Sequence, residues 1–212
     1  MWPQGATSGI TIAGENGSGE ELNQISFLYG MCFHERTSTP YVVDFFYNRI
    51  VKFPNGNHDG IIVAGQKGEE SNSKSISTPT GVYVDECETV YIADAGNDRI
   101  QKWLKGATEG ITVAGGFGRG LNASQFNGPW TIRVDKYNNM YIIDAFNARV
   151  QKWAPNANAG VTIIGGNGFG DRPDQFSYAY GLALDSEGNI FVSELGNNRI
   201  QKFSIQPETN SC

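Results

Sequence analysis

Arg99-Ile-Gln-Lys-Trp103 is one of four copies of a short pattern: arginine, a β-branched residue, a variable residue, lysine and an aromatic residue. The copies begin at Arg49, Arg99, Arg149 and Arg199, which are spaced fifty residues apart. A period held through the chain indicates that one supersecondary unit is copied and stacked. Residue types that recur in every copy are therefore expected to serve folding, and chemistry is expected where one copy departs from the others.

Two further apolar runs precede each copy of this pattern, and a third follows the first three copies. Around Arg99 they are Gly81-Val-Tyr-Val-Asp85, Tyr91-Ile-Ala-Asp94 and Ile111-Thr-Val-Ala114. These runs are short, rich in β-branched and aromatic residues, and bounded by Gly, Asn or Asp, as strands are. None has the length or the i, i+3, i+4 spacing of a helix. Each full copy therefore predicts four strands of about five residues.

Four short antiparallel strands per unit, repeated radially, are typical of the blade of a β-propeller. We expect a single all-β domain over residues 1–212. Its blades are expected at about 30–65, 80–115, 130–165 and 180–203 plus 10–14, and residues 204–212 are expected to be a tail. In this hypothesis Ile10-Thr-Ile-Ala13 is the fourth strand of the last blade and closes a ring of four blades. The alternative, a piece of a larger ring such as a six-bladed one, stays open.

Composition excludes several classes of protein. The net charge of −6 and the scattered basic residues disfavour a nucleic-acid surface, which needs clustered Lys and Arg. No apolar run approaches the roughly 20 residues of a membrane span, and no signal peptide is visible. Two glycosylation sequons, Asn16-Gly-Ser18 and Asn122-Ala-Ser124, favour an extracellular setting only slightly, so the compartment is left unassigned.

An acidic residue stands five positions before the arginine of each copy. A tight connection between two strands would bring the two side chains together, where a charge-assisted pair can brace the turn. Because the set is nearly uniform between copies, we expect a structural role rather than a catalytic one. The pairs are Asp44 with Arg49, Asp94 with Arg99, Asp144 with Arg149, and Glu194 with Arg199.

The order Gly-Val-x-Val-Asp, then Tyr-Ile-Ala-Asp-x-x-Asn-x-Arg-Ile-Gln-Lys-Trp, resembles the NHL-repeat family of β-propellers. The copies at Gly81 and Gly181 match best, whereas the copy at Met31 has Tyr47 where the others have asparagine. The resemblance implies three functions known in that family group. They are substrate recognition as part of a RING-type ubiquitin ligase, metal-dependent lyase chemistry and RNA binding.

The sequence offers few candidates for catalysis. His34 aligns with Val84 at an apolar position, so an interior histidine is favoured over a ligand or base. Cys32 aligns with Val82, and a buried thiol acting as a small hydrophobe is expected there. Glu35 and Asp85, with their counterparts in the later copies, could surround a cation near the axis or open the turns that follow them. We expect no catalytic residue, no metal site and no cofactor, and hence a chain that is not an enzyme.

The remaining candidate is a surface at the entrance to the central channel. Trp130 and Tyr180 are placed there, in register with Gly30 and Thr80, and two more aromatic residues are expected close by. Exposed aromatic residues in a concave setting are favoured binding anchors, although the same residues could plug the channel. The predicted function is protein or peptide binding, by a monomer if the ring closes and otherwise by an oligomer or part of a larger chain. The predicted binding residues are Tyr29, Thr80, Trp130, Phe146 and Tyr180.

Overall fold

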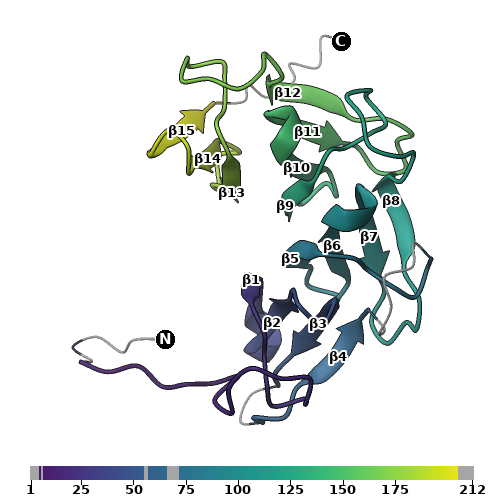
Figure 1. The fold of residues 1–212 in the computed structure, drawn as a ribbon, viewed down its shortest axis with the longest axis vertical. Coiled ribbons are helices and arrows are strands. Elements are labelled where there is room, and N and C mark those ends of the chain that lie inside the picture. The colour runs from purple at the N-terminus through teal and green to yellow at the C-terminus, as the bar shows by residue number, and fades with distance from the viewer. Residues whose placement is uncertain (1–4, 6, 55–56, 66–71, 205–212) are drawn as a thin grey trace.

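The computed structural model describes residues 5, 7–54, 57–65 and 72–204. Its strands form four antiparallel sheets arranged radially (Figure 1), which confirms the predicted all-β propeller with four repeats. No helix among these residues has the length and apolar character needed to cross a membrane.

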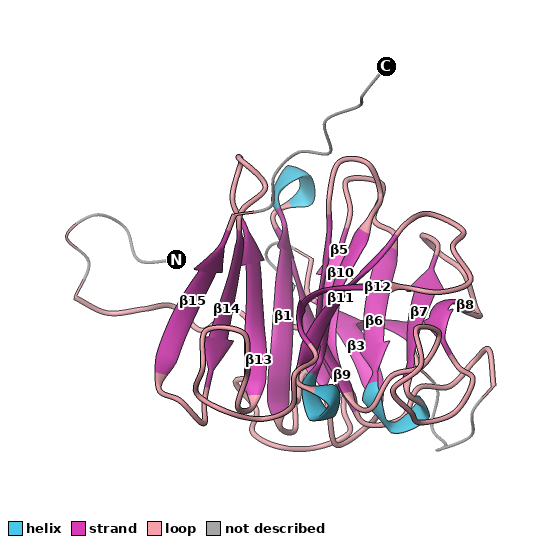
Figure 2. Cartoon of the chain, turned by 90° about the horizontal axis from the view of Figure 1, so that it is seen from above, coloured by secondary structure: helices cyan, strands magenta, loops and turns pink. Residues whose placement is uncertain are grey.

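The first three blades have four strands each, and the last has three. Blade 1 holds β1 (Leu28–His34), β2 (Thr39–Asp44), β3 (Arg49–Lys52) and β4 (Ile61–Ala64); blade 2 holds β5 (Pro79–Val84), β6 (Val90–Asp94), β7 (Arg99–Trp103) and β8 (Ile111–Gly115). Blade 3 holds β9 (Pro129–Val134), β10 (Met140–Asp144), β11 (Arg149–Trp153) and β12 (Val161–Gly165); blade 4 holds β13 (Ala179–Leu184), β14 (Ile190–Glu194) and β15 (Arg199–Phe203). The 3₁₀ turns η1 (Glu35–Thr37), η2 (Ala95–Asn97) and η3 (Ala145–Asn147) lie at the ends of the blades (Figure 2).

The hydrophobic core consists of layers between neighbouring blades. Between blades 3 and 4, for example, Ile143 and Val150 pack against Leu182 and Val192. The second strand of each of the first three blades is buried along its whole length, including all six residues of β2. A continuous apolar run such as Tyr41-Val-Val is therefore stable as a strand, because neither of its faces meets water.

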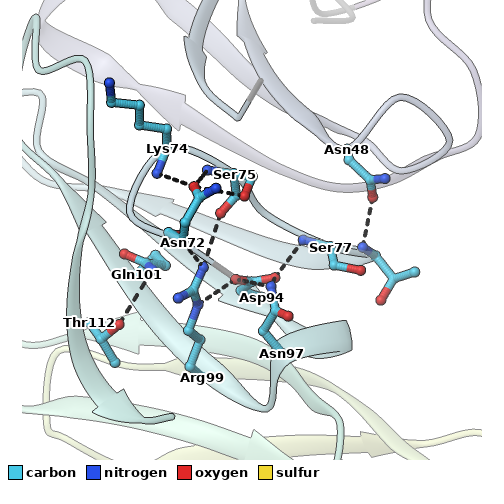
Figure 3. Close-up of polar contacts among 11 residues, drawn as sticks. Asn48, Asn72, Lys74, Ser75, Ser77, Asp94, Asn97, Arg99, Gln101 and Thr112 are labelled. Carbon is cyan, nitrogen blue, oxygen red and sulfur yellow. Dashed lines mark hydrogen bonds and ion pairs between the residues drawn. The ribbon is translucent and has the colours of Figure 1, made fainter. Parts of the chain in front are cut away.

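The predicted pair of acid and arginine braces the connection between the second and third strands. In blade 2 the Nε of Arg99 donates to Oδ2 of Asp94 at 2.7 Å, and the backbone N–H of Ser77 donates to Oδ1 of Asp94 at 2.7 Å (Figure 3). Arg99 also donates to the carbonyl oxygen of Asn72, so the pair ties this connection to the segment entering the blade. The same pair forms in the other blades, at 2.8 Å for Asp44–Arg49, 2.8 Å for Asp144–Arg149 and 2.6 Å for Glu194–Arg199.

In blades 1 and 2 the last residue of the same connection ties the blade to the next one. It adopts a left-handed conformation, with φ near 50° at Asn48 and at Asp98. Oδ1 of Asn48 accepts the backbone N–H of Thr78 at 2.7 Å (Figure 3), and Oδ1 of Asp98 accepts that of Gly128 at 2.9 Å. Asparagine and aspartate tolerate this backbone conformation because their side chains are short and polar, and the same side chains supply the acceptor oxygen.

The expected strand over residues 10–13 is not formed, and blade 4 keeps three strands. Instead, Ala13 and Ile25 pack against Val42, Val51 and Phe53 of blade 1, where they gain an apolar contact without pairing with β15. The arc of blades is open between β13 and β1 (Figure 1). The described residues form four blades, so a six-bladed ring is wrong for this structure. The predicted tail lies outside the described residues beyond position 204.

The fifty-residue register also fails at the start of the chain. Phe33 pairs with Pro40, seven positions on, whereas Val84 pairs with Val90, six positions on. Blade 1 therefore has one extra residue between its first two strands, in the segment that forms η1. Every position before this segment is shifted by one relative to the later copies. The predicted equivalence of His34 with Val84 is wrong for this reason, and Phe33 holds that place.

Candidate functional site

The candidate site lies at the end of the blades where the second strand turns into the third. There the first residues of the innermost strands meet these connections through backbone hydrogen bonds. The N–H of Phe146 donates to the carbonyl oxygen of Asn127 at 3.1 Å, and that of Leu195 donates to Tyr178 at 3.0 Å. The strands β1, β5, β9 and β13 lie innermost in the arc (Figure 1).

A bulge directs one side chain of each innermost strand toward the axis. The register shifts near the start of all four strands, and the shift in β13 lies between Ala179 and Gly181. Bulges at the rim of a β-structure re-aim side chains in this manner. Because blade 1 has the extra residue, Tyr29 rather than Gly30 shares this position with Thr80, Trp130 and Tyr180. Close approaches support the register, since Gly30 lies against Gly81 and Gly81 against Thr131.

Three of these four residues meet at the axis. The rings of Tyr29 and Trp130 are 5.5 Å apart in an edge-on arrangement, and those of Trp130 and Tyr180 are 4.3 Å apart. Tyr29 belongs to blade 1 and Trp130 to blade 3, so this contact passes over the blade between them. Burial, followed by the neighbouring hydroxyls of Tyr178 and Tyr29, raises the pKa of Tyr180. The tyrosine is therefore a neutral hydrogen-bond donor at neutral pH.

The contacts continue on both sides of this centre. Tyr29 lies 4.6 Å from Phe45, Tyr180 lies 6.3 Å from Tyr178, and Tyr178 lies 5.7 Å from Phe169, measured between ring centroids. We call this series of rings the aromatic track; it comprises Phe169, Tyr178, Tyr180, Trp130, Tyr29 and Phe45. Tyr29, Tyr178 and Phe169 are each about half exposed, at 47%, 47% and 49%. The track is thus a surface as well as a packed cluster.

The other two predicted binding residues lie differently. Thr80 is buried, and its hydroxyl donates to the carbonyl oxygen of Pro129 at 3.0 Å, so it joins blades 2 and 3. Phe146 belongs to η3 and is 45% exposed, and among the described residues it makes no ring contact with the axial cluster. With Phe169 it lines a surface pocket of about 540 Å³ formed by loops of blades 3 and 4. Since Phe169 belongs to the track, the pocket opens beside the outer end of the track.

Sequence reasoning missed Tyr178, Phe169 and Phe45. A sequence signal existed for Tyr178, because it stands fifty residues after Gly128; in the structure it takes a left-handed conformation with φ 50°. A bulky residue with positive φ is uncommon and is worth inspection as a sign of function. Phe27 and Thr78 share this conformation at the same place in blades 1 and 2, so the strain belongs to the bulge, and blades 1 and 4 both place an aromatic residue there.

His34 and the acids of the opposite end have structural roles. Nδ1 of His34 lies 2.7 Å from the hydroxyl of Thr37, and Nε2 lies 3.4 Å from the carbonyl oxygen of Glu86. Asp85 accepts the N–H groups of Cys87 and Thr89 at 2.9 and 2.8 Å, which closes the turn after β5. Asp135 and Asp185 make equivalent bonds. No group of three or more His, Cys, Asp or Glu side chains suited to a metal ion occurs in the described part of the chain.

Comparison with known proteins supports the fold. The family model described as NHL repeat matches residues 176–203, and no curated protein matches the chain. Together with the blades, this match confirms the predicted likeness to the NHL-repeat β-propellers.

Three solved structures illustrate what this fold can carry. A gluconolactonase from Xanthomonas campestris is 13% identical, with a TM-score of 0.66, over 87% of this chain and 60% of that one. An auxiliary nutrient binding protein from Bacteroides thetaiotaomicron is 16% identical, with a TM-score of 0.66, over 86% and 49%. A streptogramin B lyase is 15% identical, with a TM-score of 0.56, over 90% and 59%. The chain thus spans 49–60% of the length of these structures.

The expectation that the chain is not an enzyme is overturned by this comparison. Two of the three structures, the gluconolactonase and the lyase, are enzymes built on the fold that this chain shares. At 13–16% identity the likeness shows the fold alone, and it assigns no reaction to this chain. Function has to be argued from the site.

Proposed function

We propose that this propeller binds a peptide segment of another protein along the aromatic track. The observation that supports the proposal is the contact series from Phe169 to Phe45, which joins blades 4, 3 and 1 on one face and leaves several rings half exposed. Tyrosine and tryptophan bury a large area with few rotatable bonds, so they serve as rigid binding anchors.

The shape of the face favours an extended ligand over a compact one. Successive rings of the track lie 4.3–6.3 Å apart, so side chains of an extended peptide could pack on several of them in turn. The pocket beside Phe169, at about 540 Å³, falls within the usual size range of ligand pockets and could take one large side chain. A substrate-recognition role in a ubiquitin ligase is a special case of this proposal, in which the bound peptide belongs to the substrate.

The proposal is tested by selecting binders from a displayed peptide library and measuring their affinity for variants. Trp130→Ala is expected to weaken the selected peptides at least about tenfold, as expected for an interface hot spot. Tyr137→Ala is the matched control, because Tyr137 is 68% exposed in the turn between β9 and β10 at the opposite end of the blades. Trp130 also packs against the core between blades 3 and 4, so Tyr29→Ala provides a second variant outside that core.

Two results would contradict the proposal. One is a selection that yields no saturable binder. The other is a set of peptides whose affinity falls equally in Trp130→Ala, Tyr29→Ala and Tyr137→Ala. Thermal melting of each variant shows that the loss is not due to unfolding.

A further inference from the structure

One position of the innermost strands differs sharply in chemistry between the blades. In blades 1 to 4 this position holds Cys32, Tyr83, Arg133 and Ala183. The four residues are equivalent, since each pairs with the aromatic residue of the adjacent strand, which is Tyr41, Tyr91, Tyr141 and Phe191 respectively. Three of the four side chains are uncharged residues that differ from one another, and only blade 3 places a guanidinium there. A departure of one copy from the others points to a role beyond folding.

Arg133 belongs to β9, one of the innermost strands of the arc (Figure 1), and its side chain is partly exposed. Its charge acts on both the thiol of Cys32 and the hydroxyl of Tyr83, lowering the pKa of each against the effect of burial. Cys32 belongs to blade 1, which does not adjoin blade 3, so the charge of Arg133 acts beyond the neighbouring blade. The ring contact between Tyr29 and Trp130 joins the same two blades.

Arg133 has no carboxylate partner among the residues that the structure describes. The chain has eight arginines, all in the described residues, and seven of them pair with Asp or Glu; Arg133 donates only to the carbonyl oxygen of Ile132, at 2.8 Å. The thiol of Cys32 and the hydroxyl of Tyr83 do not neutralise the charge of Arg133. Burial raises the pKa of both groups and keeps them uncharged at neutral pH. A half-buried cation without a counter-ion attracts anions more strongly than one in bulk water.

We infer that Arg133 binds a carboxylate of the ligand that the aromatic track receives. A guanidinium presents paired N–H donors in a fork that matches the two oxygens of a carboxylate. Arg133 lies three residues along β9 from Trp130, about 10 Å at the rise of a strand. A ligand with an aromatic group on the track and a carboxylate one residue away spans this separation. The inference rests on the proposed function and narrows its ligand class to peptides that present a free C-terminal carboxylate.

The test compares two small probes that differ only in charge: N-acetyl-tryptophanyl-glycine with a free carboxylate, and the same dipeptide as its C-terminal amide. Calorimetric titration of the wild-type chain is expected to show the acid binding about tenfold more tightly, the effect of one charge-assisted hydrogen bond. Arg133→Gln is expected to reduce this preference to within about twofold. Arg36→Gln is the control: Arg36 is 68% exposed on η1, and the substitution changes the net charge equally.

The outcomes separate the inference from the proposal beneath it. Equal affinity of acid and amide, or a preference that survives in Arg133→Gln, overturns the inference while binding that depends on Trp130 still supports the peptide-binding role. Failure of both probes to bind the wild-type chain overturns the inference, and the library selection then decides the proposed function by itself.

Discussion

Ile100 and Ile200 occupy the same register position on the third strand of their blades, opposite Ala93 and Ser193, yet Ile100 is fully buried and Ile200 is 72% exposed. Blade 3 covers Ile100, whereas no blade of the described residues covers Ile200. The repeated sequence therefore places one side chain in two different environments within one molecule.

This pair predicts unequal effects of the same substitution. Ile100→Ala is expected to lower the free energy of unfolding by about 2–5 kcal/mol, because it removes buried methyl groups and leaves a cavity. Ile200→Ala is expected to change it by less than about 0.5 kcal/mol, as for an exposed residue. Urea denaturation measures both values. Similar losses for the two variants would mean that the outer face of blade 4 is covered in solution.

The brace between acid and arginine predicts that removing the acid destabilises blade 2 more than blade 4. In Asp94→Asn the guanidinium of Arg99, which is only 7% exposed, would lose its counter-ion in the interior. We therefore expect the free energy of unfolding to fall by about 3–5 kcal/mol. In Glu194→Gln the partner Arg199 is 28% exposed and can regain water, so the loss should be at least about 1 kcal/mol smaller. The free energies of unfolding of the two variants decide the order, and an equal or reversed order would contradict the role of burial.

The environment of Glu88 predicts that the stability of the fold depends on pH. Hydrogen bonds from Lys105, then Lys52 and Tyr41, hold the pKa of Glu88 at about 2, against burial, which acts to raise it. Because this folded-state pKa lies below the ordinary value of 4.5, the carboxylate stabilises the fold above pH 4.5. That contribution is lost as the pH falls from 4.5 toward 2.

The measurement is the difference in urea midpoint between wild type and Glu88→Gln at several pH values. We expect a constant difference above pH 5 that shrinks steadily below pH 4.5. Glu86→Gln, at a carboxylate that is 93% exposed, is the control for the chemical change. A difference that stays constant down to pH 2 would show that the ionised form of Glu88 is not preferred in the folded chain.

The close approach of the innermost strands predicts different tolerance of two glycines. A Cβ on Gly81 would lie 2.5 Å from the carbonyl oxygen of Trp130 in the next blade, so Gly81→Ala requires the backbone to move. We expect it to cost about 1–3 kcal/mol. A Cβ on Gly181 would meet only the hydroxyl of Ser193, which can rotate away, so Gly181→Ala should change stability by less than about 1 kcal/mol. The reverse order in urea denaturation would mean that β5 and β9 are farther apart in solution.

Much of the candidate site could be anticipated, but its register could not. Trp130 and Tyr180 were predicted at the channel entrance and lie in contact there. Tyr29 was predicted close by, yet it shares the register of those two residues, because the extra residue in the η1 segment moves the first copy by one position. Thr80 holds the same register position and is buried, since its hydroxyl bonds the next blade rather than solvent. A single inserted residue leaves the fifty-residue period visible while changing which side chains are equivalent.

The sequence by itself determined the blade architecture, because each strand and each brace between acid and arginine forms within one copy from residues close together in the chain. Tertiary structure alone decided that Tyr29 meets Trp130, 101 positions away, and that the charge of Arg133 acts on the thiol of Cys32. It also decided that residues 10–13 pack on blade 1 without joining blade 4. These outcomes depend on how whole sheets pack against one another, and that packing joins residues whose separation no local pattern records.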